Sequence, residues 1–159
     1  TGVFLAHLVH AMGATRILEI GTSNGYSTLW LAHATAQLDG HVTTIEQDVA
    51  KIEQAKINFN RAHLTDHIMQ VEADAGQLLL NVQASAFDII FLDSDRSAYL
   101  DWWPHIRQAI RVGGAVVVDN ATSHAQEMQT FMEMVAADTC FSNKLVDIGN
   151  GEFMAIRTA

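Results

Sequence analysis

The chain has 159 residues, of which 49% are hydrophobic and 17% charged, a composition that suits one domain with a full hydrophobic core. Nine basic residues against eighteen acidic ones give a formal charge of −9, which argues against nucleic acid or an anionic membrane surface as a partner. The single cysteine, Cys140, excludes an internal disulfide and favours a reducing compartment, so we expect a cytoplasmic protein. No apolar run has the length of a membrane span, and no signal peptide is recognisable.

The first predicted element is a helix. Apolar residues recur at helical spacing from Phe4 to Met12, and Gly13 ends the run. Because Thr1 already lies inside this pattern, we expect that an N-terminal helical segment is missing from the sequence. We interpret residues 1–159 as a single domain.

The stretch that follows combines a strand, a glycine-punctuated loop and the start of a helix. The predicted strand Arg16–Ile20 leads into the loop Gly21–Gly25, and a helical pattern begins at Tyr26. Such a unit presents backbone N–H groups and a helix N-terminus to a ligand. The loop lacks the Gly-x-Gly-x-x-Gly pattern of pyrophosphate binding, and Glu19 adds an acid, so a cationic or zwitterionic nucleoside fits better than a nicotinamide dinucleotide. The alternative interpretation is an ordinary glycine-rich turn.

The second predicted strand, His41–Ile45, ends at an acid. Glu46 lies about twenty residues beyond the glycine loop, where nucleotide-binding α/β folds place an acid on the ribose hydroxyls. A carboxylate accepts hydrogen bonds from both hydroxyls of a cis-diol, so we predict that Glu46 binds a ribose. A solvated acid at the end of a strand is the alternative. Asp48 is placed to cap the next helix, whose apolar face runs from Val49 to Ala62.

Strands and helices alternate through the rest of the chain. The predicted strands are Ile68–Glu72, Phe87–Leu92 and Ala115–Val118, and the predicted helices are Gln77–Asn81, Trp102–Ile110 with Pro104 in its first turn, and a segment with the buried stripe Met128–Val135. Gly113-Gly114 is predicted to be a turn, and Leu145–Ile148 with Phe153–Ile156 to be a terminal β-hairpin. This alternation predicts an α/β fold with helices on both faces of a mostly parallel, seven-stranded sheet that ends in an antiparallel hairpin.

Polar side chains follow the carboxyl ends of the predicted strands, which is where open α/β sheets bind ligands. They are Glu19, Glu46, Asp74, Asp93 with Asp95, and Asp119 with Asn120. Asp93, Asp119 and Asn120 supply carboxylate and amide oxygens, the hard ligands that Mg²⁺ or Ca²⁺ prefers, and no Cys/His grouping suits zinc. We therefore predict a divalent-cation site here, with a helix cap and a turn as the alternatives.

Taken together, these motifs resemble the cation-dependent O-methyltransferases, the class I S-adenosylmethionine (SAM) methyltransferases that include catechol and caffeoyl-CoA O-methyltransferases. The residues that carry the resemblance are Leu18–Thr22 with Gly25–Ser27, Thr44–Glu46, Phe91–Asp95, Tyr99, and Gly113-Gly114 with Asp119-Asn120. The resemblance implies a Rossmann-like SAM methyltransferase fold, SAM as cofactor, a divalent cation (Mg²⁺ or Ca²⁺), and methyl transfer to a hydroxyl of a small catechol-like acceptor. It also implies a segment before Thr1 that helps cover SAM and substrate and supports a homodimer.

The same resemblance assigns roles to single residues. Glu46 would hold the ribose, Asp74 and Ala75 would flank the adenine, and the glycine loop with Ser27 would contact the methionine part. The predicted cofactor-binding set is Glu19, Gly21, Ser23, Gly25, Tyr26, Ser27, Glu46, Asp74, Ala75 and Asp93. The predicted metal ligands are Asp93, Asp119 and Asn120, and the predicted catalytic residues are Asp93 and Arg96.

Arg96 is a departure from the family pattern, which commonly has lysine three residues after the first metal-binding aspartate, as the proposed general base. Arginine does not lose its proton at useful pH, so we expect Arg96 to stabilise a phenolate by its charge instead. His124 is a candidate base by position only, and an exposed loop histidine is its alternative interpretation. Arg96 therefore leaves two further functions open: a metal-independent methyltransferase with another acceptor, and a catalytically silent SAM-binding or scaffold domain.

Overall fold

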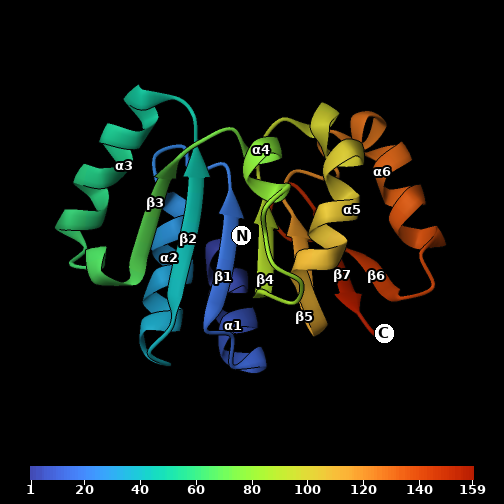
Figure 1. The fold of residues 1–159 in the computed structure, drawn as a ribbon, viewed down its shortest axis with the longest axis horizontal. Helices are drawn as coiled ribbons and strands as arrows, with labels where there is room; N and C mark the ends of the chain where they lie inside the picture. Colours follow the sequence, from blue (N-terminus) through green and yellow to red (C-terminus); the bar gives the residue numbers. More distant parts are fainter.

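The computed structural model describes residues 1–159 and contains one seven-stranded sheet in the order β3-β2-β1-β4-β5-β7-β6 (Figure 1). The strands are β1 (Arg16–Ile20), β2 (His41–Glu46), β3 (Ile68–Glu72), β4 (Phe87–Leu92), β5 (Ile110–Val118), β6 (Phe141–Val146) and β7 (Glu152–Arg157). The first five strands are parallel, and β7 lies antiparallel between β5 and β6. The predicted sheet and its antiparallel C-terminal hairpin are confirmed.

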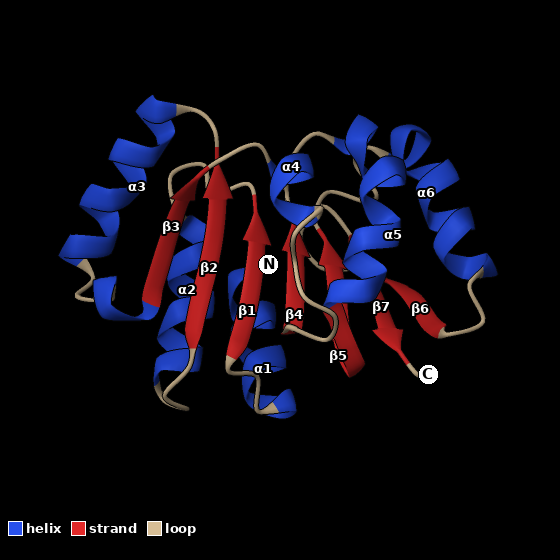
Figure 2. Cartoon of the chain, viewed as in Figure 1, coloured by secondary structure: helices blue, strands red, loops and turns tan.

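The helices cover both faces of the sheet, as the alternating pattern predicted. They are α1 (Gly2–Met12), α2 (Tyr26–Ala36), α3 (Val49–Arg61), α4 (Ala75–Leu79), α5 (Tyr99–Ala109) and α6 (Ala125–Ala137). Figure 2 shows α1 and α2 behind the sheet and α4, α5 and α6 in front of it. Asp48 caps α3 as expected, since its carboxylate accepts from the backbone N–H groups of Ala50 and Lys51. None of the helices is both long enough and apolar enough to cross a membrane.

Two separate cores hold these layers together, because successive side chains of a strand point to opposite faces of the sheet. Ile17 of β1 packs with α1 and α2, in a cluster that includes Leu5 and Leu31. Leu18, the next residue of β1, packs on the other face with α5 and α6, in a cluster that includes Phe131. Burial on both faces explains why β4 and the second half of β5 are nearly continuous apolar runs.

The predicted start of α5, at Trp102, was wrong. This helix begins at Tyr99, so Pro104 lies in its interior and not in its first turn. Tyr99 is fully buried, and its hydroxyl accepts from the Ser94 backbone N–H at 2.9 Å and donates to the Ser94 carbonyl at 3.2 Å. Core packing of Tyr99 therefore fixes the helix start, although Pro104 leaves the Leu100 carbonyl without its usual helical donor.

The predicted turn at Gly113-Gly114 was also wrong, because both glycines lie inside β5, which begins at Ile110. Gly113 has a φ of +76°, and the pairing of β4 with β5 shifts register between Phe87 and Ile89. A glycine with positive φ in a strand is typical of a β-bulge. Two other elements also differ from their predicted bounds. The helix α4 spans Ala75–Leu79 and not Gln77–Asn81, and β6 begins at Phe141 and not at Leu145.

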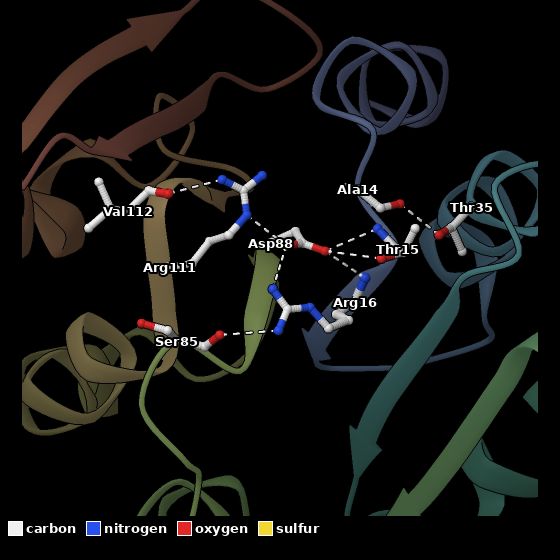
Figure 3. Close-up of polar contacts among 8 residues, drawn as sticks. All are labelled: Ala14, Thr15, Arg16, Thr35, Ser85, Asp88, Arg111 and Val112. Carbon is white, nitrogen blue, oxygen red and sulfur yellow. Dashed lines mark hydrogen bonds and ion pairs between the residues drawn. The ribbon is translucent and has the colours of Figure 1, made fainter.

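The amino ends of β1, β4 and β5 are joined by a polar network around Asp88 (Figure 3). One carboxylate oxygen of Asp88 accepts from the backbone N–H groups of Thr15 and Arg16, at 3.0 and 2.9 Å. The other oxygen accepts from the guanidinium groups of Arg16 and Arg111, at 2.8 and 2.7 Å. These donors hold the pKa of Asp88 well below its usual value, against the opposing effect of burial. The network lies at the end of the sheet opposite the rim on which ligands bind.

Candidate functional site

Two clefts open at the carboxyl ends of the parallel strands, and Gly21 lines both of them. The first cleft, of about 190 Å³, is lined by residues that include Glu46, Asp74, Ala75 and Trp102. The second, also of about 190 Å³, is lined by Ser23, Tyr26, Ser27, Asp93 and Asp119 among others. The structure thus brings together most of the residues that the sequence analysis had assigned to ligand binding.

The glycine loop follows a path that only glycine accommodates at two positions. Gly21 has a φ of +103°, and a Cβ atom there would lie 2.0 Å from the Asp93 carbonyl oxygen. Gly25 has a φ of +85°, and a Cβ atom there would lie 2.4 Å from the Phe59 ring. The loop is therefore pressed against the end of β4 on one side and against α3 on the other.

Glu19 lies behind this loop and has no exposed surface. Its carboxylate accepts from the hydroxyls of Ser27 at 2.5 Å, Thr44 at 2.6 Å and Thr28. Burial raises the pKa of Glu19 to about 7, although the three hydroxyl donors act in the opposite direction. Because Glu19 lines neither cleft, any contribution to a ligand passes through Ser27, whose side chain it orients, or through Thr44 and the Thr22 hydroxyl 2.6 Å from it.

Glu46 ends β2 and faces the first cleft. One carboxylate oxygen accepts from the Ser23 backbone N–H of the glycine loop at 3.1 Å. The other accepts from the backbone N–H groups of Gln47 at 3.0 Å and Asp48 at 3.1 Å. These backbone donors fix the carboxylate in one orientation and leave its free acceptor site on the oxygen that accepts from Ser23.

Asp74, Ala75 and Trp102 form the far wall of the first cleft. Asp74 caps α4, because its carboxylate accepts from the Gln77 backbone N–H at 2.9 Å. Trp102 stands over Gly76, since a Cβ atom at Gly76 would lie 3.0 Å from its indole nitrogen. The sequence offered little to single out Trp102, because adjacent tryptophans in a helix usually pack in the core; here Trp103 does so and Trp102 lines the cleft.

Asp93, Asp119 and Asn120 meet at the ends of β4 and β5. The Asn120 side-chain amide donates to the Asp93 carboxylate at 3.2 Å, and the Asn120 backbone N–H donates to the Asp119 carboxylate at 2.6 Å. Burial and the nearby charge of Asp119 raise the pKa of Asp93. No three acidic, histidine or cysteine side chains are gathered in a ready-made metal cluster. The predicted ligands are two carboxylates and an amide, and the amide nitrogen is directed at Asp93.

Arg96 and His124 lie near this group, and the charge of each lowers the pKa of Asp93, less strongly than burial raises it. Arg96 begins a 3-10 turn (Arg96–Ala98), and its Nε atom is buried without a hydrogen-bond partner. His124 is the N-cap residue of α6, and its Nδ1 lies 2.9 Å from the Ser123 hydroxyl. The two positively charged or chargeable side chains near Asp93 are therefore the ones that the sequence analysis had considered for catalysis.

Glu152, which no sequence pattern singled out, is fully buried at the start of β7. Burial raises its pKa to about 7, and the Asp119 charge contributes to this shift. Glu152 follows Gly149-Asn150-Gly151, so the sequence placed it in a hairpin turn, where an acid is expected to be solvated. Only the register of the antiparallel pair shows that its side chain faces inward.

The fold is that of a Rossmann-like domain, and its two clefts lie at the carboxyl ends of the strands, where open α/β sheets bind ligands. A family model described as O-methyltransferase matches residues 1–158, and the chain belongs to this family.

Individual relatives agree with this assignment. The chain is 39% identical over 122 residues to a catechol O-methyltransferase of Mycobacterium tuberculosis. The matched segment covers 75% of this chain and 54% of that protein. It is 32% identical over 123 residues to a caffeoyl-CoA O-methyltransferase of Populus kitakamiensis, covering 75% of this chain and 52% of that protein. Among solved structures, the O-methyltransferase TomG of Streptomyces achromogenes in complex with SAM has a TM-score of 0.87 and 28% identity, covering 99% of this chain and 79% of that one. The chain spans about half the length of the curated relatives it matches.

Proposed function

We propose that this chain is the catalytic core of a SAM-dependent O-methyltransferase that acts on a small catechol-like aromatic acceptor with the help of a divalent cation. The observation that carries the proposal is the junction of the two clefts at Gly21. One cleft offers the Glu46 carboxylate and the other offers Asp93 and Asp119. A nucleoside in the first cleft would therefore direct its far end toward the second.

Membership of the O-methyltransferase family and the likeness to a SAM-bound structure support SAM as the ligand. Glu46 would accept from the two ribose hydroxyls, while Asp74, Ala75 and Trp102 would enclose the adenine. Ser27 and the backbone of the glycine loop would meet the methionine part. SAM supplies an electrophilic methyl group on a sulfonium, and its positive charge suits the acidic character of this rim.

The residues present fit a hard divalent cation. Asp93 and Asp119 are carboxylates at adjacent strand ends, and Asn120 carries a third oxygen, which accepts from the Asn150 side-chain amide at 3.0 Å. Crowding of Asp93 by the Asp119 charge is the situation that a bound cation would relieve. Such a cation would hold two adjacent oxygens of an acceptor and lower the pKa of a phenol.

Arg96 would act on the acceptor by its charge. Its guanidinium keeps its proton at all working pH values, so it stabilises a phenolate and does not remove the phenolic proton. Alignment of the acceptor hydroxyl with the methyl group supplies much of the remaining rate enhancement. A homodimer, which the family resemblance implies, belongs to the same proposal and is tested by sedimentation equilibrium.

The test is methyl transfer to a catechol, measured with SAM and Mg²⁺, with SAM and EDTA, and with the Asp119→Asn variant. We expect turnover only with the cation and the intact carboxylate, together with nearly unchanged binding of S-adenosylhomocysteine (SAH) by the variant. Turnover that EDTA leaves intact would support a metal-independent enzyme. Binding of SAH without turnover on any phenol would support a silent SAM-binding domain.

A further inference from the structure

A third carboxylate, that of Glu152, lies behind the two predicted cation ligands. Glu152 is the first residue of β7 and has no exposed surface. One of its carboxylate oxygens accepts from the Thr1 hydroxyl at 2.7 Å, and the other is buried without a hydrogen-bond partner. Leaving a carboxylate oxygen buried and unpaired is costly, so this arrangement requires a physical reason.

The strand register places Glu152 directly beside Asp119. Val118 of β5 pairs with Phe153 of β7 in the antiparallel ladder, so Asp119 and Glu152 are the next pair along. Their carboxylates therefore stand side by side at the end of the ladder between β5 and β7. Like charges at directly opposed positions destabilise a pair of strands.

Asp93 is the third carboxylate in a row with Glu152 and Asp119. Leu92 of β4 pairs with Val118 of β5, so Asp93 lies beside Asp119 on the side away from Glu152. The three carboxylates of this row thus stand at the ends of the adjacent strands β4, β5 and β7. The three ion pairs of the structure are Arg16–Asp88, Arg107–Asp138 and Arg111–Asp88, and none of them involves this row.

We propose that Glu152 is a third acidic determinant of the divalent-cation site, acting from behind Asp119. This inference rests on the proposed function, because the cation held by Asp93, Asp119 and Asn120 would add to the positive charge that Arg96 and His124 bring near Asp93. Glu152 is a positioning residue in this scheme: it stands beside Asp119, limits the orientations of that carboxylate, and adds negative charge beside the cation. Partners of metal-binding side chains commonly act in this way.

Glu152→Gln is the informative substitution, because it has nearly the same shape. The glutamine oxygen can still accept from Thr1, while its amide donates to Asp119 and relieves the repulsion. Asp147→Asn is the matched control, since Asp147 is exposed in the same hairpin and the substitution removes the same charge. Glu152→Asp keeps the charge and serves as the second variant.

Mn²⁺ and Mg²⁺ binding is measured by titration calorimetry at pH 8.5, with unfolding temperatures recorded with and without Mn²⁺. For Glu152→Gln we expect about 10- to 100-fold weaker Mn²⁺ binding, the usual effect of losing such a partner. We also expect a higher unfolding temperature without metal and a smaller increase when Mn²⁺ is added. Asp147→Asn should match the parent, and Glu152→Asp should bind Mn²⁺ more tightly than the glutamine variant.

A purely structural role for Glu152, as the anchor of Thr1, gives the opposite result. It predicts unchanged Mn²⁺ affinity in Glu152→Gln, and that outcome overturns the inference. Absence of Mn²⁺ and Mg²⁺ binding by the parent protein is a different outcome, because it refutes the cation site itself and, with it, the inference.

Discussion

Replacing Asp88 by asparagine tests whether the polar network at the amino ends of the strands stabilises the fold. In Asp88→Asn, one side-chain oxygen remains for the backbone N–H groups of Thr15 and Arg16. The other oxygen becomes an amide nitrogen that faces the guanidinium groups of Arg16 and Arg111. The substitution therefore removes two charge-assisted hydrogen bonds and sets donor against donor.

The size of the effect follows from exposure. Each charge-assisted hydrogen bond contributes about 1.5–3 kcal/mol when the donor is shielded from water. The Arg16 side chain is 51% exposed and that of Arg111 is 32% exposed, so water compensates for much of the first contact and part of the second. We expect a loss of about 2–4 kcal/mol from a total stability of about 5–15 kcal/mol. With a typical urea dependence, the unfolding midpoint falls by about 1–2 M.

The assay is urea unfolding of the parent and Asp88→Asn at pH 7 and at several lower pH values, with the exposed Asp147→Asn as control. Because the folded state holds the pKa of Asp88 below its unfolded value, the stability from Asp88 is present above the unfolded value and is lost as pH falls through the folded one. The parent should therefore converge on the variant in acid. Equal midpoints at pH 7, or a difference that does not shrink in acid, would refute the reasoning.

Three further predictions concern the rim. Glu46→Gln should weaken SAH binding about tenfold or more in calorimetry, because charge-assisted hydrogen bonds to the ribose are worth about 1.5–3 kcal/mol each; equal affinity would contradict the ribose role. Arg96→Lys should change the rate on a catechol little and Arg96→Ala should lower it; a rise of about 10²–10⁴-fold for lysine, with a new limb in the pH–rate profile, would instead show that a general base was missing. Burial raises the pKa of Glu19 to about 7 from an ordinary 4.5, so the stability of the parent should fall as pH rises through that range. The stability of Glu19→Gln should not depend on pH in this way. If the urea midpoints of the parent and the variant change equally with pH, the raised pKa of Glu19 is refuted.

The sequence was sufficient for the elements whose apolar pattern is local. Alternating strands and helices predicted the sheet, and the acids after each strand predicted which side chains would share its rim. The start of α5 was misplaced, because Tyr99 is buried by residues distant in sequence. This burial outweighs the local preference of Pro104 for a first turn. Gly113-Gly114 was misread because a glycine pair gives the same local signal in a turn and in a bulge, and only pairing with β4 separates the two.

Glu152 shows the limit of the same reasoning within the site. Its inward orientation depends on the register of β7 against β5, which places it opposite Asp119. A one-residue change of register would have turned the side chain to the other face of the sheet, and no local pattern fixes that register. The residues of the rim that were predicted, such as Glu46, follow their strands directly and need no register to be located.

The contacts of Glu19 also bear on the entropy that the protein would lose when a ligand binds. Its carboxylate joins β1 to two hydroxyls of α2 and one of β2, so the strand and helix that flank the glycine loop are fixed to each other from within. The loop consequently takes its shape when the domain folds, before any ligand is present. Little conformational entropy is then lost on this side of the complex during association, and the ordering cost of binding falls on the flexible ligand.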